Sequence, residues 1–262
     1  MIGRVGVYLS EESQPFLFYV SWVLSKIAKR ADFLYLEEDP ILKGIMGIFR
    51  FKSGEKENFL RRHVEEFFED FSFHTLRGSI KEFFNTLQDN YDLLFVQHKR
   101  QFLHKSIPER LLLDTDKLSL WIYKEPCSAS LKKVCIPLDF SERSLRQVSM
   151  ADYLKSFFNI EYHLVYSLNT DRFKGKLSRK DYSKTLSDKE EEVRHMYSDM
   201  FGSKDVKLIV LEGNPYKYMA EYINSSDYDM VIIGKRGKGM RERMGSVSLY
   251  MVRNVRCPLI VL

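Results

Sequence analysis

The stretch Asp227-Tyr-Asp-Met-Val-Ile-Ile-Gly234 decides the fold of this chain. Within it, Met230 to Ile233 is a short apolar run, rich in β-branched residues and closed by a glycine, which is typical of a buried strand. Further glycines, Gly237 and Gly239, follow at once. The backbone after the strand is therefore free to turn tightly and to approach a ligand closely.

A helix and a last strand are predicted after this glycine loop. Ser246 is the expected N-cap of the helix, whose apolar positions Leu249, Val252 and Val255 repeat at helical spacing. The residues from Pro258 onward are predicted to form the last strand. A glycine loop between a strand and a helix N-terminus presents unpaired N–H groups and a positive dipole end, which suits phosphate.

This order of strand, G-x-x-G, gap, Gly-Ser, helix and short strand resembles the nucleotide motif of the universal stress protein family. In the ATP-binding branch of that family, nine residues separate the second glycine from the Gly-Ser pair. Here the seven residues Lys238 to Met244 lie between Gly237 and Gly245, so the loop is two residues shorter.

Length and composition indicate a globular protein of about two domains. The chain has 262 residues and a net charge of +5, which is too small a charge at this length to indicate nucleic acid by itself. Its three cysteines form no metal-ligand spacing and no disulfide framework, so we expect a cytoplasmic protein. No apolar run approaches ~18 residues, and the first residues lack the layout of a signal peptide, so no membrane association is expected.

Strands and helices alternate along the chain. The predicted strands are 5–9, 33–36, 71–76, 93–96 and 118–123, then 134–138, 162–168, 206–211, 230–233 and 258–262. The predicted helices are 13–30, 58–70, 80–87, 141–158, 187–200, 215–224 and the one opened by Ser246. The segments 39–53 and 169–184 are predicted to be loops.

The two halves of the chain also repeat one another. Tyr91 to Val96 matches Tyr228 to Ile233, and Val5, Val7 and Leu9 match Val134, Ile136 and Leu138 at a constant offset. The sequence therefore predicts an α/β protein of two tandem five-stranded parallel-sheet domains, 1–126 and 131–262, with helices on both faces. The resemblance implies a universal stress protein-like fold, related to the adenine nucleotide alpha hydrolases.

The resemblance also implies where a nucleotide would bind. Asp139 ends the first strand of the second half and would contact the nucleoside, with Pro137 and Leu138 beside the base and Ser167 at a base-lining position. The alternative is that Asp139 caps the following helix together with Ser141. The residues assigned to the site are Pro137, Leu138, Asp139, Ser167, Ile233, Gly234, Gly237, Gly245, Ser246, Val247 and Ser248.

The glycine loop is basic, which favours an anion electrostatically. Its cations are Lys235, Arg236, Lys238, Arg241 and Arg243. The alternatives are a solvated surface loop for these cations and a tight turn without a ligand for the glycines.

The first half lacks the same motif. Ser10 takes the place of Asp139, while Gln97 and Arg100 take the places of Gly234 and Gly237. The Gly-Ser pair is missing, so we expect this domain to be degenerate, to bind no ATP in the family's manner and to serve as a packing partner. Solvent exposure or polar packing is expected for His98 and His104.

Three functions remain open at this stage. The first is a stress-response or regulatory module that binds ATP or another adenine nucleotide through its second half, with Mg²⁺ or Mn²⁺ held by the phosphates. The resemblance leaves slow ATP hydrolysis open, but no catalytic residue, protein metal site, P-loop, zinc spacing or nucleophile elbow is predicted.

The second is a nucleotide-free, dimerising interaction or scaffold protein of the same fold. The third and least favoured is weak nucleic-acid binding through the basic loop and Lys132-Lys133. The resemblance further implies a homodimer, or an intramolecular pseudo-dimer formed through strands 118–123 and 258–262. It also implies a protein partner, which the sequence does not identify.

Overall fold

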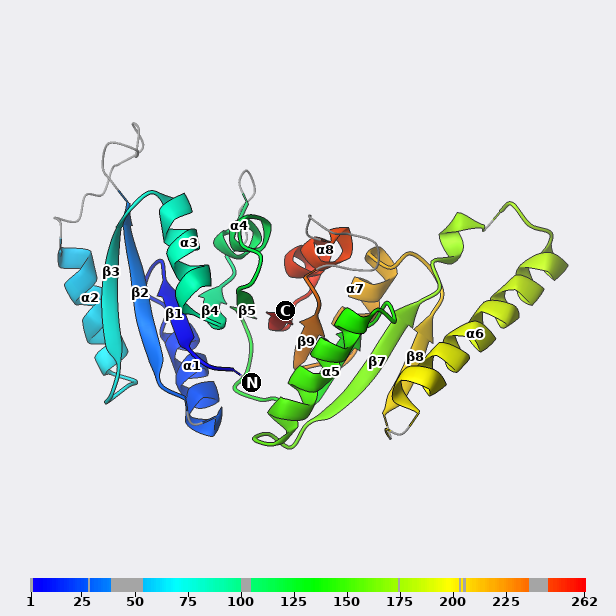
Figure 1. Ribbon diagram of the computed structural model, residues 1–262, viewed down its shortest axis with the longest axis horizontal. Coiled ribbons are helices and arrows are strands. Elements are labelled where there is room, and N and C mark those ends of the chain that lie inside the picture. The colour runs from blue at the N-terminus through cyan, green and yellow to red at the C-terminus, as the bar shows by residue number, and fades with distance from the viewer. Residues whose placement is uncertain are drawn as a thin grey trace. The chain divides into compact units, whose positions relative to one another are not determined.

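The computed structural model divides the chain into two compact units, Met1–Ser130 and Leu131–Leu262. In each unit helices alternate with strands (Figure 1). The structure describes residues 2–27, 29–38, 54–99, 105–173, 175–202, 204, 206–235 and 245–262. The α/β class and the parallel strands predicted from the sequence are confirmed.

The first unit holds a parallel sheet in the order β3-β2-β1-β4-β5. Its strands are β1 (Val5–Leu9), β2 (Ala31–Glu38), β3 (Ser72–Gly78), β4 (Leu93–Gln97) and β5 (Ser119–Tyr123). Its helices are α1 (Gln14–Ile27), α2 (Glu55–Glu65), α3 (Ile80–Asn90) and α4 (Ile107–Asp114).

The second unit repeats this topology in the order β10-β9-β6-β7-β8. Its strands are β6 (Lys133–Pro137), β7 (Glu161–Ser167), β8 (Lys207–Leu211), β9 (Met230–Ile233) and β10 (Leu259–Val261). Its helices are α5 (Glu142–Lys155), the 3₁₀ turn η2 (Thr170–Arg172), α6 (Arg179–Phe201), α7 (Lys217–Ser225) and α8 (Ser246–Asn254). The strand order reverses beside β6, where open α/β sheets bind ligands at their carboxyl edge.

The repeated Tyr-Asp pair has a structural explanation in both units. The Asp92 carboxylate accepts the Arg4 N–H at 2.8 Å, and the Asp229 carboxylate accepts the N–H groups of Lys132 and Lys133 at 2.7 and 2.9 Å. Each aspartate thus fixes the start of the central strand of its sheet, by charge-assisted hydrogen bonds.

The helices of the structure differ from the predicted ones in two places. Helix α6 begins at Arg179 rather than near Ser187, because Ser178 caps it by accepting the Asp181 N–H at 3.2 Å. Part of the predicted loop 169–184 is therefore helical, although that part carries almost no buried apolar face. Helix α4 was not predicted, yet the Ser106 N–H and hydroxyl both donate to the Glu109 carboxylate, at 2.8 and 2.7 Å.

Other boundaries shift by a few residues. Helix α2 spans Glu55–Glu65 rather than 58–70. Ser246 is the first residue of α8, and Gly245 takes the N-cap position that was predicted for Ser246. The predicted loop 39–53 and the basic-loop residues Arg236 to Met244 lie outside the described residues, as do Arg100 and His104.

Among the helices that the structure describes, none has the length and apolar character required to cross a membrane.

Candidate functional site

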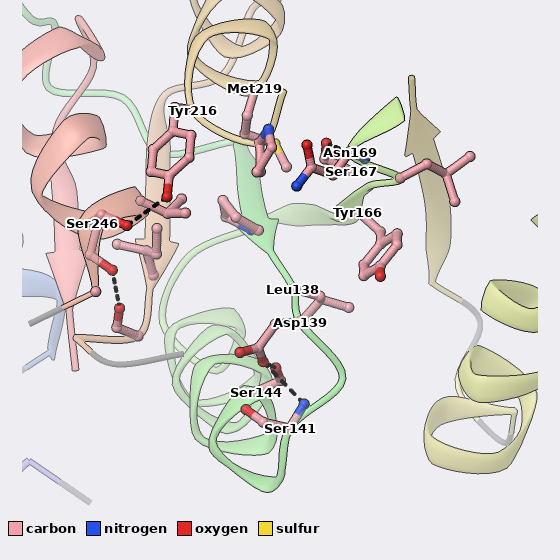
Figure 2. A pocket seen from close by; sticks show the side chains of 18 of the residues that line it. Leu138, Asp139, Ser141, Ser144, Tyr166, Ser167, Asn169, Tyr216, Met219 and Ser246 are labelled. Atoms are coloured by element: carbon pink, nitrogen blue, oxygen red, sulfur yellow. Dashed lines mark hydrogen bonds between the residues drawn. The ribbon is translucent and has the colours of Figure 1, made fainter. Parts of the chain in front are cut away.

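A cavity of about 620 Å³ lies at the carboxyl edge of the sheet in the second unit. It contains every described residue that was assigned to the site from the sequence; Gly237 lies outside the described residues. The end of β6 with the start of α5, the end of β7, the turn into α7, and the end of β9 with the start of α8 meet there (Figure 2), and η2 and α6 also contribute to the lining. Its volume is within the range of small-molecule sites.

Asp139 makes the capping contacts that were considered as an alternative role. Its Oδ1 accepts the Ser141 N–H at 3.0 Å and the Ser144 hydroxyl at 2.9 Å (Figure 2). Ser141 occupies the N-cap position of α5 but makes no side-chain cap. Asp139 therefore supports the helix start, and it is also the one carboxylate among the described residues that line the cavity.

The backbone turns abruptly on the cavity rim. Phe140, directly after Asp139, has φ of 52°, and Asn169, shortly after β7, has φ of 49°. Non-glycine residues seldom adopt this left-handed region, and such strain concentrates at functional sites. Phe140 is held there by ring packing against Tyr166, with centroids 5.2 Å apart.

Several donors of the glycine loop are used inside the protein. The Gly245 N–H donates to the Lys235 carbonyl at 2.9 Å, and the Ser248 hydroxyl donates to the Gly234 carbonyl at 2.6 Å. Buried Gln147 faces the Gly234 N–H with its amide oxygen and donates its amide nitrogen to the Pro137 carbonyl at 3.0 Å, in the orientation that satisfies both. The first two bonds close the two ends of the loop on one another, and the Gln147 contacts hold Gly234 against β6 and α5.

The first turn of α8 offers the remaining donors. The first N–H groups of a helix have no partner within the helix and sit at its positive dipole end. Ser246, Val247 and Ser248 form this turn and line the cavity. The Ser246 hydroxyl lies 2.7 Å from the Tyr216 hydroxyl (Figure 2).

The β7 side of the cavity is built differently. The Ser167 hydroxyl donates to the Gly213 carbonyl at 2.7 Å, so it holds the neighbouring loop in place. Burial raises the pKa of the Tyr166 phenol, the Glu192 and Asp139 carboxylates raise it further, and the Arg172 guanidinium acts against them. Tyr166 is thus neutral at physiological pH, a polar-tipped aromatic wall.

The described lining of the cavity carries three cations and one carboxylate. The cations are Arg143 in the first turn of α5, Arg172 in η2 and Lys189 in α6. An excess of positive charge at a concave site attracts anionic ligands. Of the cations predicted from the glycine loop, only Lys235 is described, and it is buried.

Sequence reasoning did not find Arg143, Arg172, Lys189 or Tyr216. The three cations lie on three different elements and Tyr216 lies in the turn before α7, and no spacing along the chain connects them. A signal was present for one of them only: Asn214-Pro215 before Tyr216 is a turn signature, and the Asn214 side chain accepts the Tyr216 N–H at 2.8 Å.

The equivalent positions of the first unit are occupied by side chains. Gln97 ends β4 at the repeat position that Gly234 holds directly after β9. Its amide donates to the Ser13 hydroxyl at 3.2 Å and to the Glu125 carboxylate at 3.4 Å. Gln97 is buried, with 9% of its surface exposed. A backbone approach of the kind that glycine allows is blocked at this position.

Within the described ranges of both units, no group of three or more His, Cys, Asp or Glu residues is placed to hold a metal ion.

Comparison with known proteins places this architecture in a family. "Universal stress protein MJ0531" of Methanocaldococcus jannaschii is 28% identical over 137 residues, which covers 50% of this chain and 81% of that protein. A functionally unknown protein from Pseudomonas aeruginosa PAO1 matches 100% of this chain and 92% of its own, with a TM-score of 0.69 at 14% identity.

A universal stress protein from Archaeoglobus fulgidus gives a TM-score of 0.67 at 17% identity over 98% of this chain and 95% of its own. At these identities the two solved structures show the shared fold alone. The model of the universal stress protein family matches residues 130–262, half of the chain and the whole of the unit that contains the cavity. The chain therefore belongs to the universal stress protein family.

Proposed function

We propose that the chain is a regulatory or stress-response module that binds an adenine nucleotide, ATP in the first place, in the cavity of its second unit. The observation that carries the proposal is the composition of the cavity. It joins Asp139 at the end of β6 to the first turn of α8 and adds three cations to a single carboxylate in its described lining. Polar groups of this kind fit a nucleoside at one point and phosphates at another.

In this proposal the base and ribose lie near Pro137, Leu138, Asp139 and Ser167. The phosphates lie against the start of α8, where N–H groups and the helix dipole favour negative charge. Mg²⁺ or Mn²⁺ would be carried by the phosphates. The ligand would act by shifting the population of partner-binding states, and the protein partner is still to be identified.

The first unit takes the role of a degenerate relative without a nucleotide site. The buried Gln97 at the end of β4 supports this part of the proposal, since it fills the place of Gly234. Tandem domains divided as 1–126 and 131–262, and self-association through the strands 118–123 and 258–262, remain predictions.

Titration of the full chain with ATP, followed by calorimetry, tests the proposal. Saturable binding that is lost in Asp139→Ala and in Gly245→Val supports it. Asp199→Ala, an exposed position on α6 away from the cavity, is the matched control and should bind as the wild type does. No binding at millimolar ATP would remove the proposal.

One observation favours a second candidate, the nucleotide-free interaction protein. The Gly234 and Gly245 N–H groups and the Ser248 hydroxyl already have partners inside the protein, as a purely structural loop requires. For that candidate, Gly245→Val should weaken folding or partner capture while ATP leaves the melting temperature of the wild type unchanged.

A further inference from the structure

We infer that Tyr216 is a phosphate-recognition residue, and that its hydroxyl and the Ser246 hydroxyl together bind a phosphate oxygen of the nucleotide. This inference rests on the proposed function and adds a residue that neither the sequence motif nor the comparisons assign. It gives the cavity a means to distinguish nucleotides from nucleosides.

The two hydroxyls are held together at the phosphate end of the cavity. The Tyr216 and Ser246 oxygens lie 2.7 Å apart, and both residues line the cavity (Figure 2). Ser246 opens α8, so the pair lies beside the N–H groups of the first helical turn. A phosphate oxygen that approaches this turn therefore meets the hydroxyl pair as well.

Tyr216 is fixed from two directions. The Asn214 side chain accepts its backbone N–H at 2.8 Å, and its ring lies edge-on to the ring of Tyr250 on α8, with centroids 6.1 Å apart. A residue whose backbone and ring are both constrained loses little conformational freedom when its hydroxyl binds a ligand. Tyr218, two residues later, is 45% exposed and does not line the cavity.

The chemistry of the pair selects an acceptor. Each hydroxyl has one proton and two lone pairs, so in the pair one hydroxyl donates to the other. Phosphate oxygens only accept, and the hydroxyl protons can rotate so that both donate to the same oxygen. The Ser248 hydroxyl, which the motif also assigned to phosphate, instead donates to the Gly234 carbonyl. Tyr216 thus supplies a donor at the edge of a loop that is two residues shorter than in the family's ATP-binding branch.

The test compares ATP with adenosine on the full chain, by calorimetry, in wild type, Tyr216→Phe and Tyr218→Phe. We expect Tyr216→Phe to lower ATP affinity by about tenfold, the loss typical of one hydrogen bond to a charged oxygen, and to leave adenosine affinity unchanged. Tyr218→Phe should bind both ligands as the wild type does. The phenyl ring preserves the contact with Tyr250, so all three proteins should melt at the same temperature.

A second variant separates a direct contact from an indirect one. In the double variant Tyr216→Phe/Ser246→Ala the ATP losses should be non-additive, because the two hydroxyls act on one oxygen. An equal loss of ATP and adenosine affinity in Tyr216→Phe overturns the inference while the proposed function stands. An unchanged ATP affinity does the same, whereas a wild type that binds neither ligand overturns both.

Discussion

At the scale of single residues, Asp139 combines a structural role with the proposed binding role. Its Oδ1 accepts from Ser141 and Ser144 and so supports the start of α5. The sequence suggested both roles as alternatives, and the geometry allows them to coexist. Oδ1 makes the helix contacts, while the residue lines the cavity.

Asp139→Asn should separate these roles. An amide oxygen can still accept from Ser141 and Ser144, so we expect the free energy of unfolding to stay near the wild-type value, whereas Asp139→Ala should lose about 1 kcal/mol through the missing cap. ATP affinity should fall in both variants, because the nucleoside loses the charge-assisted hydrogen bonds that a carboxylate accepts and that neither an amide nor a methyl group replaces. Urea unfolding and ATP titration measure the two effects. An Asn variant that binds ATP normally would show that the charge is not used.

A second residue-scale prediction concerns His63 in the first unit. Its Nδ1 lies 3.0 Å from the Phe59 carbonyl and its Nε2 lies 2.6 Å from the Glu12 carboxylate. Both nitrogens can donate only when the ring is protonated. The Phe59 carbonyl, and after it the Glu12 carboxylate, therefore raise the pKa of His63 above its ordinary value of 6.5.

Because the pKa of His63 is higher in the folded than in the unfolded protein, its contacts with Phe59 and Glu12 stabilise the fold fully at pH values below the unfolded-state pKa of 6.5. This stabilisation is lost as the pH rises through the pKa of His63 in the folded protein. We expect the melting temperature of wild type to fall further between about pH 6 and pH 8 than that of His63→Gln. Glu12→Gln should show a reduced fall. An NMR titration that places the His63 pKa below 6.5 would contradict the account.

At the scale of elements, the sequence predicted the strands well and the polar helices poorly. Most strands carry a run of apolar residues that the sheet buries, and that pattern is visible without a structure. The edge strands β3 and β8 are exceptions, because their residues are only half-buried or exposed. Helix α6 has only Val193 and Phe201 buried, so apolar periodicity gave no sign of its first turns. The signal that was present lay in the caps, Ser178 with Asp181 and Ser106 with Glu109.

Two capping boxes allow a matched comparison. Ser79 with Glu82 opens α3 at an exposed site, and Ser106 with Glu109 opens α4 at a buried one. We expect Ser79→Ala to lower the free energy of unfolding by about 1 kcal/mol. Ser106→Ala should cost more, because it leaves the Glu109 carboxylate, only 5% exposed, with fewer donors. Chemical unfolding of both variants measures this, and an equal loss would contradict it.

The cavity cations on η2 and α6 give the other element-scale prediction. Arg172→Gln and Lys189→Gln should each lower ATP affinity and weaken its dependence on salt, with little effect on adenosine. Arg179→Gln is the charge-matched control, because Arg179 lies on α6 with Lys189 but does not line the cavity. Titrations at low and high salt measure the effect. If the control loses as much affinity as Arg172→Gln, general attraction rather than the cavity is responsible.

At the scale of the whole molecule, the two units share a repeated sequence pattern but differ in the residue that follows or ends one strand of the sheet. Both keep the Tyr-Asp pair that fixes the central strand, by Asp92 in one and Asp229 in the other. Only the second has glycine at the end of the strand beside the switch point, while the first has the buried Gln97. This difference could be predicted from the sequence. At one repeat position a glycine lets the backbone approach a ligand closely, whereas the side chain of a glutamine prevents that approach.

The lining of the cavity was less predictable. Asp139, Gly234 and Ser246 follow from the motif, but Tyr216, Arg172 and Lys189 come from elements that only folding brings to the same place. We therefore expect one nucleotide per chain, and a stoichiometry near two in an ATP titration would show that the first unit binds as well.

The most direct test of the central claim is a crystal structure of the full chain with ATP. The account predicts nucleotide density between Asp139 and the first turn of α8, with a phosphate oxygen on the Tyr216 and Ser246 hydroxyls, and none at Gln97 in the first unit. A cavity filled by the protein's own side chains at saturating ATP, or a nucleotide bound in the first unit instead, would contradict it.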